Sequence, residues 1–296
     1  MLKRLFMFGA AAASAGAAIG YVKARAAFRT WGIDKGIAAR ELVGDEILPD
    51  AEAIDTRVIE IAAPPKAVWP WLVQMGYGRA GWYSYDELDM HQRSADAIIP
   101  ELQHVKVGDV FPTHPGGGFV AKIVKANEAL VLYADRALVE AQAREAHAAG
   151  VGIEAAPANV KATGAYLEAS MRGDFKASWA FVLEPLPDGR TRLIERFRGH
   201  MEMPLEPETP KFAPELAAKA LLFGLFVMAR KQLLGIRDRA EGRPITHSPW
   251  RELALQGREK AMTAAASARA AARSREIEPR EVAEPAIEPA AVPTPA

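Results

Sequence analysis

The 296-residue sequence contains no cysteine. Disulfides, thiolate zinc sites, iron–sulfur clusters and cysteine nucleophiles are therefore excluded. The chain also lacks a net charge, because 37 lysines and arginines balance 37 aspartates and glutamates. A neutral chain has no overall field that would attract nucleic-acid phosphates. We expect neither cysteine chemistry nor a nucleic-acid partner.

Motifs for metal, phosphate and acyl chemistry are missing as well. The six histidines include no pair at the i,i+3 or i,i+4 spacing that places two metal ligands on one helix face. Gly116-Gly117-Gly118 is not followed by the Lys-Ser/Thr of a phosphate loop, so it predicts a hairpin turn. No serine occupies a G-x-S-x-G motif. We expect no metal site, no cofactor and no hydrolase.

The N-terminus has an uncharged run from Leu5 to Val22 with basic residues on both sides. About 18 helical residues just span a bilayer, so residues 1–29 are predicted to form a membrane anchor of undetermined orientation. The run also fits a secretory signal cleaved near Ala13-Ser14-Ala15, which would leave a secreted or periplasmic protein. A surface-lying or soluble helix is a further alternative.

Composition divides the rest of the chain. Residues 30–52 combine glycines with mixed charges and predict an extended linker. Residues 53–241 predict one domain, interrupted at 137–172 by an alanine-rich, helix-prone insertion. Residues 251–296 are rich in alanine, glutamate and proline and predict a disordered tail.

Hydrophobic periodicity predicts an α+β fold. Alternation at 55–62 indicates a first strand, and Pro64-Pro65 ends it and starts a helix to about Met75. A second short helix is expected after the aromatic stretch 78–89. Strand patterns follow from 105 to 135, at 175–183 and at 191–198, and a long helix at about 214–240. We expect a curved antiparallel sheet of about seven strands wrapped around that C-terminal helix, with a cavity between them.

Several stretches together resemble one known family. They include IEIAAPPKAVWPWLVQMGYGRAGWYSYD at 59–86, VKVGDVFP at 105–112 and SWAFVLEPLPDGRTRLIERFR at 178–198. The chain is similar over 53–136 and 174–241 to the SRPBCC superfamily, the START and polyketide cyclase-like helix-grip proteins. It most resembles a bacterial subgroup with an N-terminal membrane tether and a WG-containing linker like Thr30-Trp31-Gly32. The resemblance implies a helix-grip fold and a hydrophobic ligand cavity, and it implies no single reaction. The insertion at 137–172 departs from the family's compact pattern.

The aromatic and methionine side chains are the candidate ligand contacts. They are concentrated on elements that would line or close the cavity, where they would form rigid apolar walls. The predicted ligand-binding residues are Trp69, Met75, Trp82, Tyr83, Tyr85, Phe111, Phe119, Trp179, Phe181, Phe223 and Met228.

Three carboxylates are candidate catalytic groups. Asp86, Asp96 and Glu195 lie beside aromatic or apolar residues, where burial would raise a carboxyl pKa. Each also has a structural interpretation: Asp86 as a helix cap, Asp96 in an ion pair with Arg93, and Glu195 in a surface ion pair between strands.

The leading functional hypothesis is a membrane-tethered protein that binds a lipid-like or aromatic small molecule between the sheet and the long helix. Its partners would be that hydrophobic molecule and the membrane. The alternative is an enzyme of cyclase or dehydratase type that uses a cavity carboxylate as general acid or base. A third hypothesis is an interaction module that docks a partner protein through the long helix or the tail.

Overall fold

The computed structural model describes residues 31–32, 35–86, 89, 93–152, 156, 173–201 and 213–245. The expected anchor at 1–29, most of 149–172 and the tail at 251–296 lie outside these residues. Within the described part, no helix is both long enough and apolar enough to cross a membrane.

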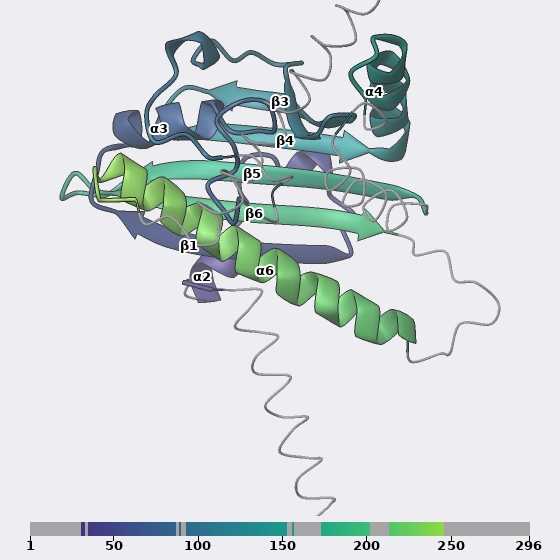
Figure 1. Cartoon of the computed structure of the whole chain (residues 1–296). Coiled ribbons are helices and arrows are strands. Elements are labelled where there is room, and N and C mark those ends of the chain that lie inside the picture. The colour runs from purple at the N-terminus through teal and green to yellow at the C-terminus, as the bar shows by residue number, and fades with distance from the viewer. Residues whose placement is uncertain are drawn as a thin grey trace, which may run out of the picture. The chain divides into compact units, whose positions relative to one another are not determined.

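The fold is α+β and is built on one antiparallel sheet (Figure 1). The described residues form six strands in the order β1-β6-β5-β4-β3-β2, where about seven were expected. Each strand pattern named from the sequence supplies one strand, and no other described segment adds a seventh. The strands are β1 Ala53–Ile61, β2 Val110–His114, β3 Gly117–Lys125, β4 Ala129–Asp135, β5 Phe175–Pro185 and β6 Thr191–Met201.

Tight turns connect the neighbouring strands. The hairpin predicted at the three glycines is confirmed, since β2 pairs with β3 across it. Gly118 has to be glycine there, because a Cβ atom would lie 2.2 Å from the Phe111 carbonyl oxygen. The Asp188-Gly189 connection between β5 and β6 is also confirmed, with Gly189 at a φ of 80°.

Two helices cover the inner face of the sheet, meaning the face that carries Ile61, Leu130, Phe181 and Leu193. Helix α3 (Pro65–Val73) starts directly after Pro64, where the missing amide hydrogen of Pro65 leaves no helical hydrogen bond unmade. Helix α6 (Ala213–Ala240) contacts β1 and α3. The second short helix expected after the aromatic stretch 78–89 falls where residues 87–88 and 90–92 lie outside the described part, and a 3₁₀ turn, η2 (Pro100–Leu102), follows it.

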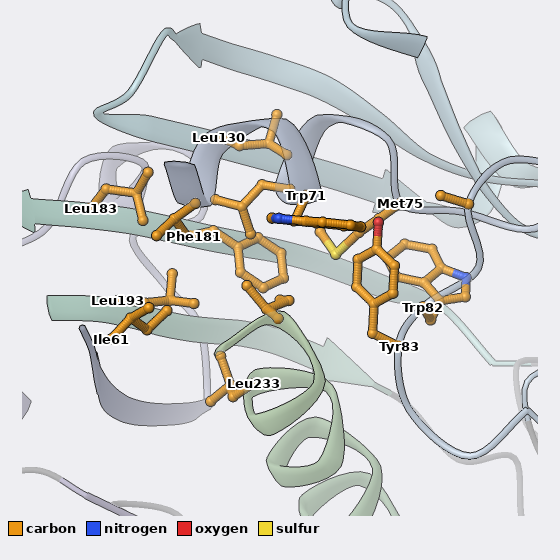
Figure 2. Close-up of a cluster of buried hydrophobic side chains, with 14 of the residues drawn as sticks. Ile61, Trp71, Met75, Trp82, Tyr83, Leu130, Phe181, Leu183, Leu193 and Leu233 are labelled. Atoms are coloured by element: carbon orange, nitrogen blue, oxygen red, sulfur yellow. The ribbon is translucent and has the colours of Figure 1, made fainter. Parts of the chain in front are cut away.

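The main core lies between this inner face, α3 and α6. Figure 2 shows side chains of the sheet and both helices meeting in it, with Leu233 contributed by α6. Burying each large apolar side chain stabilises the fold by about 1.5–3 kcal/mol. The fully buried members with large side chains are Ile61, Leu72, Met75, Tyr83, Phe111, Leu130, Leu132, Phe181, Leu193, Leu233 and Ile236.

The outer face is covered by residues expected to be an extended linker. They form α2 (Lys35–Ala39) and the 3₁₀ turn η1 (Asp45–Ile47), and Leu42 joins a second apolar cluster with Val58 and Ile194. The stretch is not extended because its apolar side chains pack on the outward-facing side chains of β1 and β6, such as Val58 and Ile194, and bury them. Seven of the eleven residues of β5, in the middle of the sheet, are buried.

Arg196 fixes this outer cover. Its guanidinium donates to the carbonyl oxygens of Ile37, Ala38 and Arg40 at 3.1, 3.2 and 2.8 Å and pairs with Asp45. Glu195 and Arg196 therefore point to opposite faces of the sheet, as neighbours in a strand must.

The Trp31-Gly32 pair contacts the sheet edge. The Trp31 carbonyl accepts a hydrogen bond from the Val58 amide at 3.0 Å, and Arg230 of α6 lies 5.2 Å from the Trp31 ring. Gly32 has a φ of +80°, and a Cβ atom there would lie 2.0 Å from the Val58 carbonyl oxygen. This close approach requires glycine.

Helix α4 (Arg136–Ala148) begins the insertion and packs on β3 and β4. The Asp135 carboxylate caps it by accepting from the Leu138 amide at 2.8 Å. Gln142 of α4 accepts a hydrogen bond from the Gly118 amide at 2.8 Å, which ties the helix to the β2–β3 hairpin.

Candidate aromatic and polar ligand site

A cluster of aromatic rings surrounds Trp179 on the inner face. The register pairs Trp179 of β5 with Phe197 of β6, so both side chains stand on the face that α6 crosses. The Trp82 ring stacks on Trp179 at 5.2 Å and 19°, and Phe181, Phe119 and Phe197 lie at 5.1, 5.7 and 6.4 Å. We call these five residues the Trp179 cluster.

The five rings of the Trp179 cluster differ in solvent exposure. Phe181 and Trp82 are buried, and Figure 2 shows both among the core side chains. Trp179, Phe119 and Phe197 are half-buried. Since these three rings occupy the inner face, that face is not completely covered beside them.

Charged groups are buried next to these rings. The Trp179 Nε1 donates to Glu195 Oε1 at 2.8 Å, and Arg57 Nη1 donates to Glu195 Oε2 at 3.3 Å. The Asp55 carboxylate is 3.7 Å from Arg57 Nη2. Glu195 is 1% exposed and Arg57 is 3% exposed, and the ring of Phe226 on α6 lies 6.0 Å from the guanidinium.

This arrangement corrects the expectation of a surface ion pair at Glu195. The pair with Arg57 does join two strands, because the register places these residues opposite each other. It is buried because odd-numbered positions of β1 and β6 face α6. Buried charges of this kind contribute little net stability, so they are a reason to look for function.

Asp86 links the aromatic stretch, in which it lies, to the segment that begins at residue 93. Its Oδ1 accepts from the Ser94 amide and hydroxyl at 3.1 and 2.7 Å, and Ser94 Oγ accepts from the Tyr83 amide at 3.0 Å. The short helix that Asp86 was expected to cap falls on residues 87–88 and 90–92, which lie outside the described part. The hydrogen bonds fix the backbone of Tyr83, which has an unusual φ of 57°.

Asp89 is a carboxylate that our sequence analysis missed. Burial raises the pKa of its carboxyl to about 7; the nearby Asp86 carboxylate adds to this rise, and a hydrogen bond with Ser84 opposes it. The Asp89 Oδ2 is buried and accepts no hydrogen bond from the residues that the structure describes. The sequence did contain one signal: Asp86 and Asp89 are three residues apart, a spacing at which two carboxylates can come close enough to raise a pKa.

Asp96 lies at the surface. It pairs with Arg93 at 2.9 Å and with Arg239 at 3.2 Å, so the ion pair named as its structural interpretation is present. Among the described contacts, Asp86 is bound by Ser94, Asp96 by Arg93 and Arg239, and Glu195 by Trp179 and Arg57, and none of these contacts joins two of the three candidate catalytic groups.

The predicted ligand-binding residues differ in how exposed their side chains are. Met75, Tyr83, Phe111 and Phe181 are fully buried core residues, while Tyr85 and Phe223 are 38% and 51% exposed. Phe119 and Trp179 combine ring contacts within the Trp179 cluster with partial exposure, whereas Trp82 of the same cluster is buried. Besides Phe119 and Trp179, the half-buried members of the predicted set are Trp69 and Met228.

No metal site was expected, and the described residues contain no group of three or more histidine, aspartate or glutamate side chains able to hold a metal ion.

Comparisons with known proteins add little. No family model matches the chain. No curated protein matches it either. Among solved structures, the chain is similar to protein MLL2253 from Mesorhizobium loti at 16% identity and a TM-score of 0.31, over 64% of this chain and 99% of that one. It is similar to Ara h 8.0201 at 12% identity and a TM-score of 0.19, over 62% of this chain and 99% of that one. TM-scores this low do not assign a fold family or a function to the present chain.

Proposed function

We propose that this chain is a membrane-tethered binding protein of helix-grip type that holds a lipid-like or aromatic small molecule between its sheet and α6. In this arrangement the sheet curves around α6. The observation that carries the proposal is the Trp179 cluster, whose three half-buried rings lie on the inner face of the sheet beside buried charged groups.

The physical basis is the combination of aromatic walls with a few fixed polar groups. Small-molecule sites are mostly apolar, and a small number of polar side chains orient the ligand. A planar ligand against Trp179, Phe119 and Phe197 would bury ring surface that is now exposed, which contributes about 25 cal/mol per Å². Rigid rings lose little conformational entropy when a ligand binds.

The proposed tether is the uncharged run at residues 5–22. A membrane anchor would raise the effective concentration of ligands that partition into the bilayer.

Binding of N-phenyl-1-naphthylamine to the full chain in detergent tests the proposal. Fluorescence of this apolar probe should rise on addition of protein, and Trp179→Leu should weaken its affinity at least tenfold. Tyr133→Leu is the matched control, since Tyr133 is a half-buried aromatic residue on the outer face of β4. No fluorescence rise with the unmodified chain, or equal losses in both variants, would contradict the proposal.

A second candidate is an enzyme of cyclase or dehydratase type. The observation that favours it is the buried Asp89 carboxyl, whose pKa of about 7 suits proton transfer at neutral pH. Dehydration of an aromatic β-hydroxyketone to its enone would reveal such activity by absorbance. If Asp89 is the acid or base, Asp89→Asn should abolish turnover and leave probe binding unchanged. Turnover that survives in this variant would exclude that role.

A further inference from the structure

Helix α6 has an exposed apolar segment at residues 223–225. Phe223 and Leu225 are 51% and 42% exposed, and a Cβ atom on Gly224 between them would meet nothing within 4 Å. The residues of α6 that belong to the main core come later in the helix, at Leu233, Leu234, Ile236 and Ala240. Large apolar side chains of α6 are therefore exposed to solvent ahead of the part that anchors the helix in the core.

The sequence around this segment is apolar on every side of the helix. Residues 220–229 include no charged side chain. A helix that is apolar all round is normally buried, either in a protein core or in a membrane. A run of ten residues is too short to cross a bilayer, which takes about 20. Such a run can still lie in the bilayer surface with its apolar side chains among the lipids.

The charges of α6 indicate what kind of surface covers this segment. Between residues 216 and 237 the helix has no aspartate or glutamate, and its basic residues are Lys219, Arg230, Lys231 and Arg237. Arg230 is exposed and Lys231 is half-buried. Anionic lipid headgroups complement such charges. Two copies of the chain that paired through this run would bring basic residues together, which is unfavourable. The charges therefore favour a lipid surface over a second copy.

The proposed tether would hold a bilayer close to this segment. The uncharged N-terminal run ends at Val22, nine residues before Trp31, and nine residues extend at most about 32 Å. The Trp31 ring lies 5.2 Å from the Arg230 guanidinium, and Leu225 precedes Arg230 by five residues, about 7.5 Å along a helix. So short a connection would give α6 a high effective concentration of lipid.

We infer that residues 223–225 of α6 insert into the surface of an anionic bilayer, with Arg230 and Lys231 at the lipid headgroups. This inference rests on the membrane tether of the proposed function and adds a second contact with the membrane. The next residue, Phe226, lies 6.0 Å from the Arg57 guanidinium, beside the Trp179 cluster. The contact would therefore bring the proposed ligand site to the membrane surface.

The absence of cysteine allows a label at one chosen position of the full chain. Leu225→Cys, and Val107→Cys as its control, each supply one thiol for the fluorophore NBD. Val107 is 60% exposed and precedes β2, which lies at the sheet edge opposite β1, the strand that α6 contacts. Both labelled chains are reconstituted into vesicles of phosphatidylcholine and phosphatidylglycerol. A fraction of the lipid has a nitroxide quencher near the top of its acyl chain.

The nitroxide should lower the fluorescence at position 225 at least about twofold, because an interfacial helix buries its apolar face about 5–10 Å into the bilayer. The label at position 107 should lose much less. Quenching at position 225 should weaken in vesicles of phosphatidylcholine alone, and also when Arg230→Gln and Lys231→Gln are combined. The control pair, Lys122→Gln with Lys176→Gln, removes two exposed lysines of the sheet and should leave the quenching unchanged.

The outcomes separate this inference from the tether it rests on. Equal quenching at positions 225 and 107, in chains that float with the vesicles, would overturn the inference and leave the tether intact. Disulfide formation between two Leu225→Cys chains would then assign the segment to a second copy. Quenching at position 225 that is independent of anionic lipid would overturn the role of Arg230 and Lys231. Failure of the chain to float with any vesicle would reject the tether. The comparison of the two labels decides even if the doubly substituted chains do not fold.

Discussion

Gly235 of α6 lies directly against the backbone of Tyr83. A Cβ atom at position 235 would be 2.3 Å from the Tyr83 carbonyl oxygen and 2.9 Å from its Cβ. Tyr83 itself has a φ of 57°, which the Asp86–Ser94 hydrogen bonds support. Helix α6 can therefore approach the aromatic loop only because residue 235 has no side chain, and this contact sets the position of the helix beside the inner face.

Gly235→Ala should destabilise the fold by about 2 kcal/mol or more, because the backbone at Tyr83 or the whole helix has to move. Gly224→Ala is the control on the same helix, since a Cβ atom there meets nothing within 4 Å. Glycine is about 1 kcal/mol worse than alanine in a helix interior, so the control should gain stability. Urea unfolding measures both variants. A neutral or stabilising Gly235→Ala would show that the contact is loose.

Gly32→Ala should also destabilise the fold, by at least about 1 kcal/mol, because it combines a positive φ with a 2.0 Å clash against the Val58 carbonyl oxygen. The matched control is Gly242→Ala, where φ is +64° and the space is open. The difference between the two variants isolates the clash from the strain of the backbone conformation. Equal effects in urea unfolding would mean that the Trp31-Gly32 pair does not dock on β1.

Arg196→Met should release the cover of the outer face. The variant removes the donors for three carbonyl oxygens and leaves the Asp45 carboxylate buried without its closest cation. Breaking a buried ion pair from one side typically destabilises by about 3–5 kcal/mol. Limited proteolysis should then cut within residues 35–50, which should resist cleavage in the unmodified chain. Arg192→Met, at a more exposed ion pair, should leave them protected.

The Asp89 carboxyl predicts a particular dependence of stability on pH. Its pKa rises from 3.8 to about 7 on folding, so between roughly pH 4 and 7 the unfolded chain releases a proton that the folded chain keeps. The free energy of unfolding should therefore fall as pH rises through this window. Asp89→Asn has no such fall, and its stability relative to the unmodified chain should increase by up to roughly 4 kcal/mol between pH 4 and pH 8.

Urea unfolding at a series of pH values measures this difference. Asp188→Asn is the control: Arg190 holds the pKa of the Asp188 carboxyl below its usual value, so its effect should be constant above pH 5. A difference for Asp89→Asn that does not change with pH would mean that the carboxyl ionises normally in the folded chain.

The strands and α3 could be predicted because their signals are local. Alternation marked β1, and Pro64-Pro65 marked the start of α3. The cover of the outer face could not be predicted in the same way, since Arg196 and Asp45 meet across 151 residues. Nothing near Asp45 indicates that an arginine of β6 will reach it.

The site was predictable only in part. The aromatic positions were named from the sequence, but an inward-facing position has the same periodicity whether it belongs to a packed core, as Phe181 does, or to a half-buried surface, as Trp179 does. The burial of Glu195 depended on the register between β1 and β6, which placed it opposite Arg57. Asp89 was missed because its unusual pKa comes from burial, which depends on the whole fold.

Native mass spectrometry of the chain, extracted gently from cells, shows directly whether the chain carries a small apolar molecule. We expect the unmodified chain to retain such a molecule and the Trp179→Leu variant to lose it, whereas Tyr133→Leu should behave like the unmodified chain. Repeated recovery of the unmodified chain without any small molecule, together with no uptake of N-phenyl-1-naphthylamine, would contradict it.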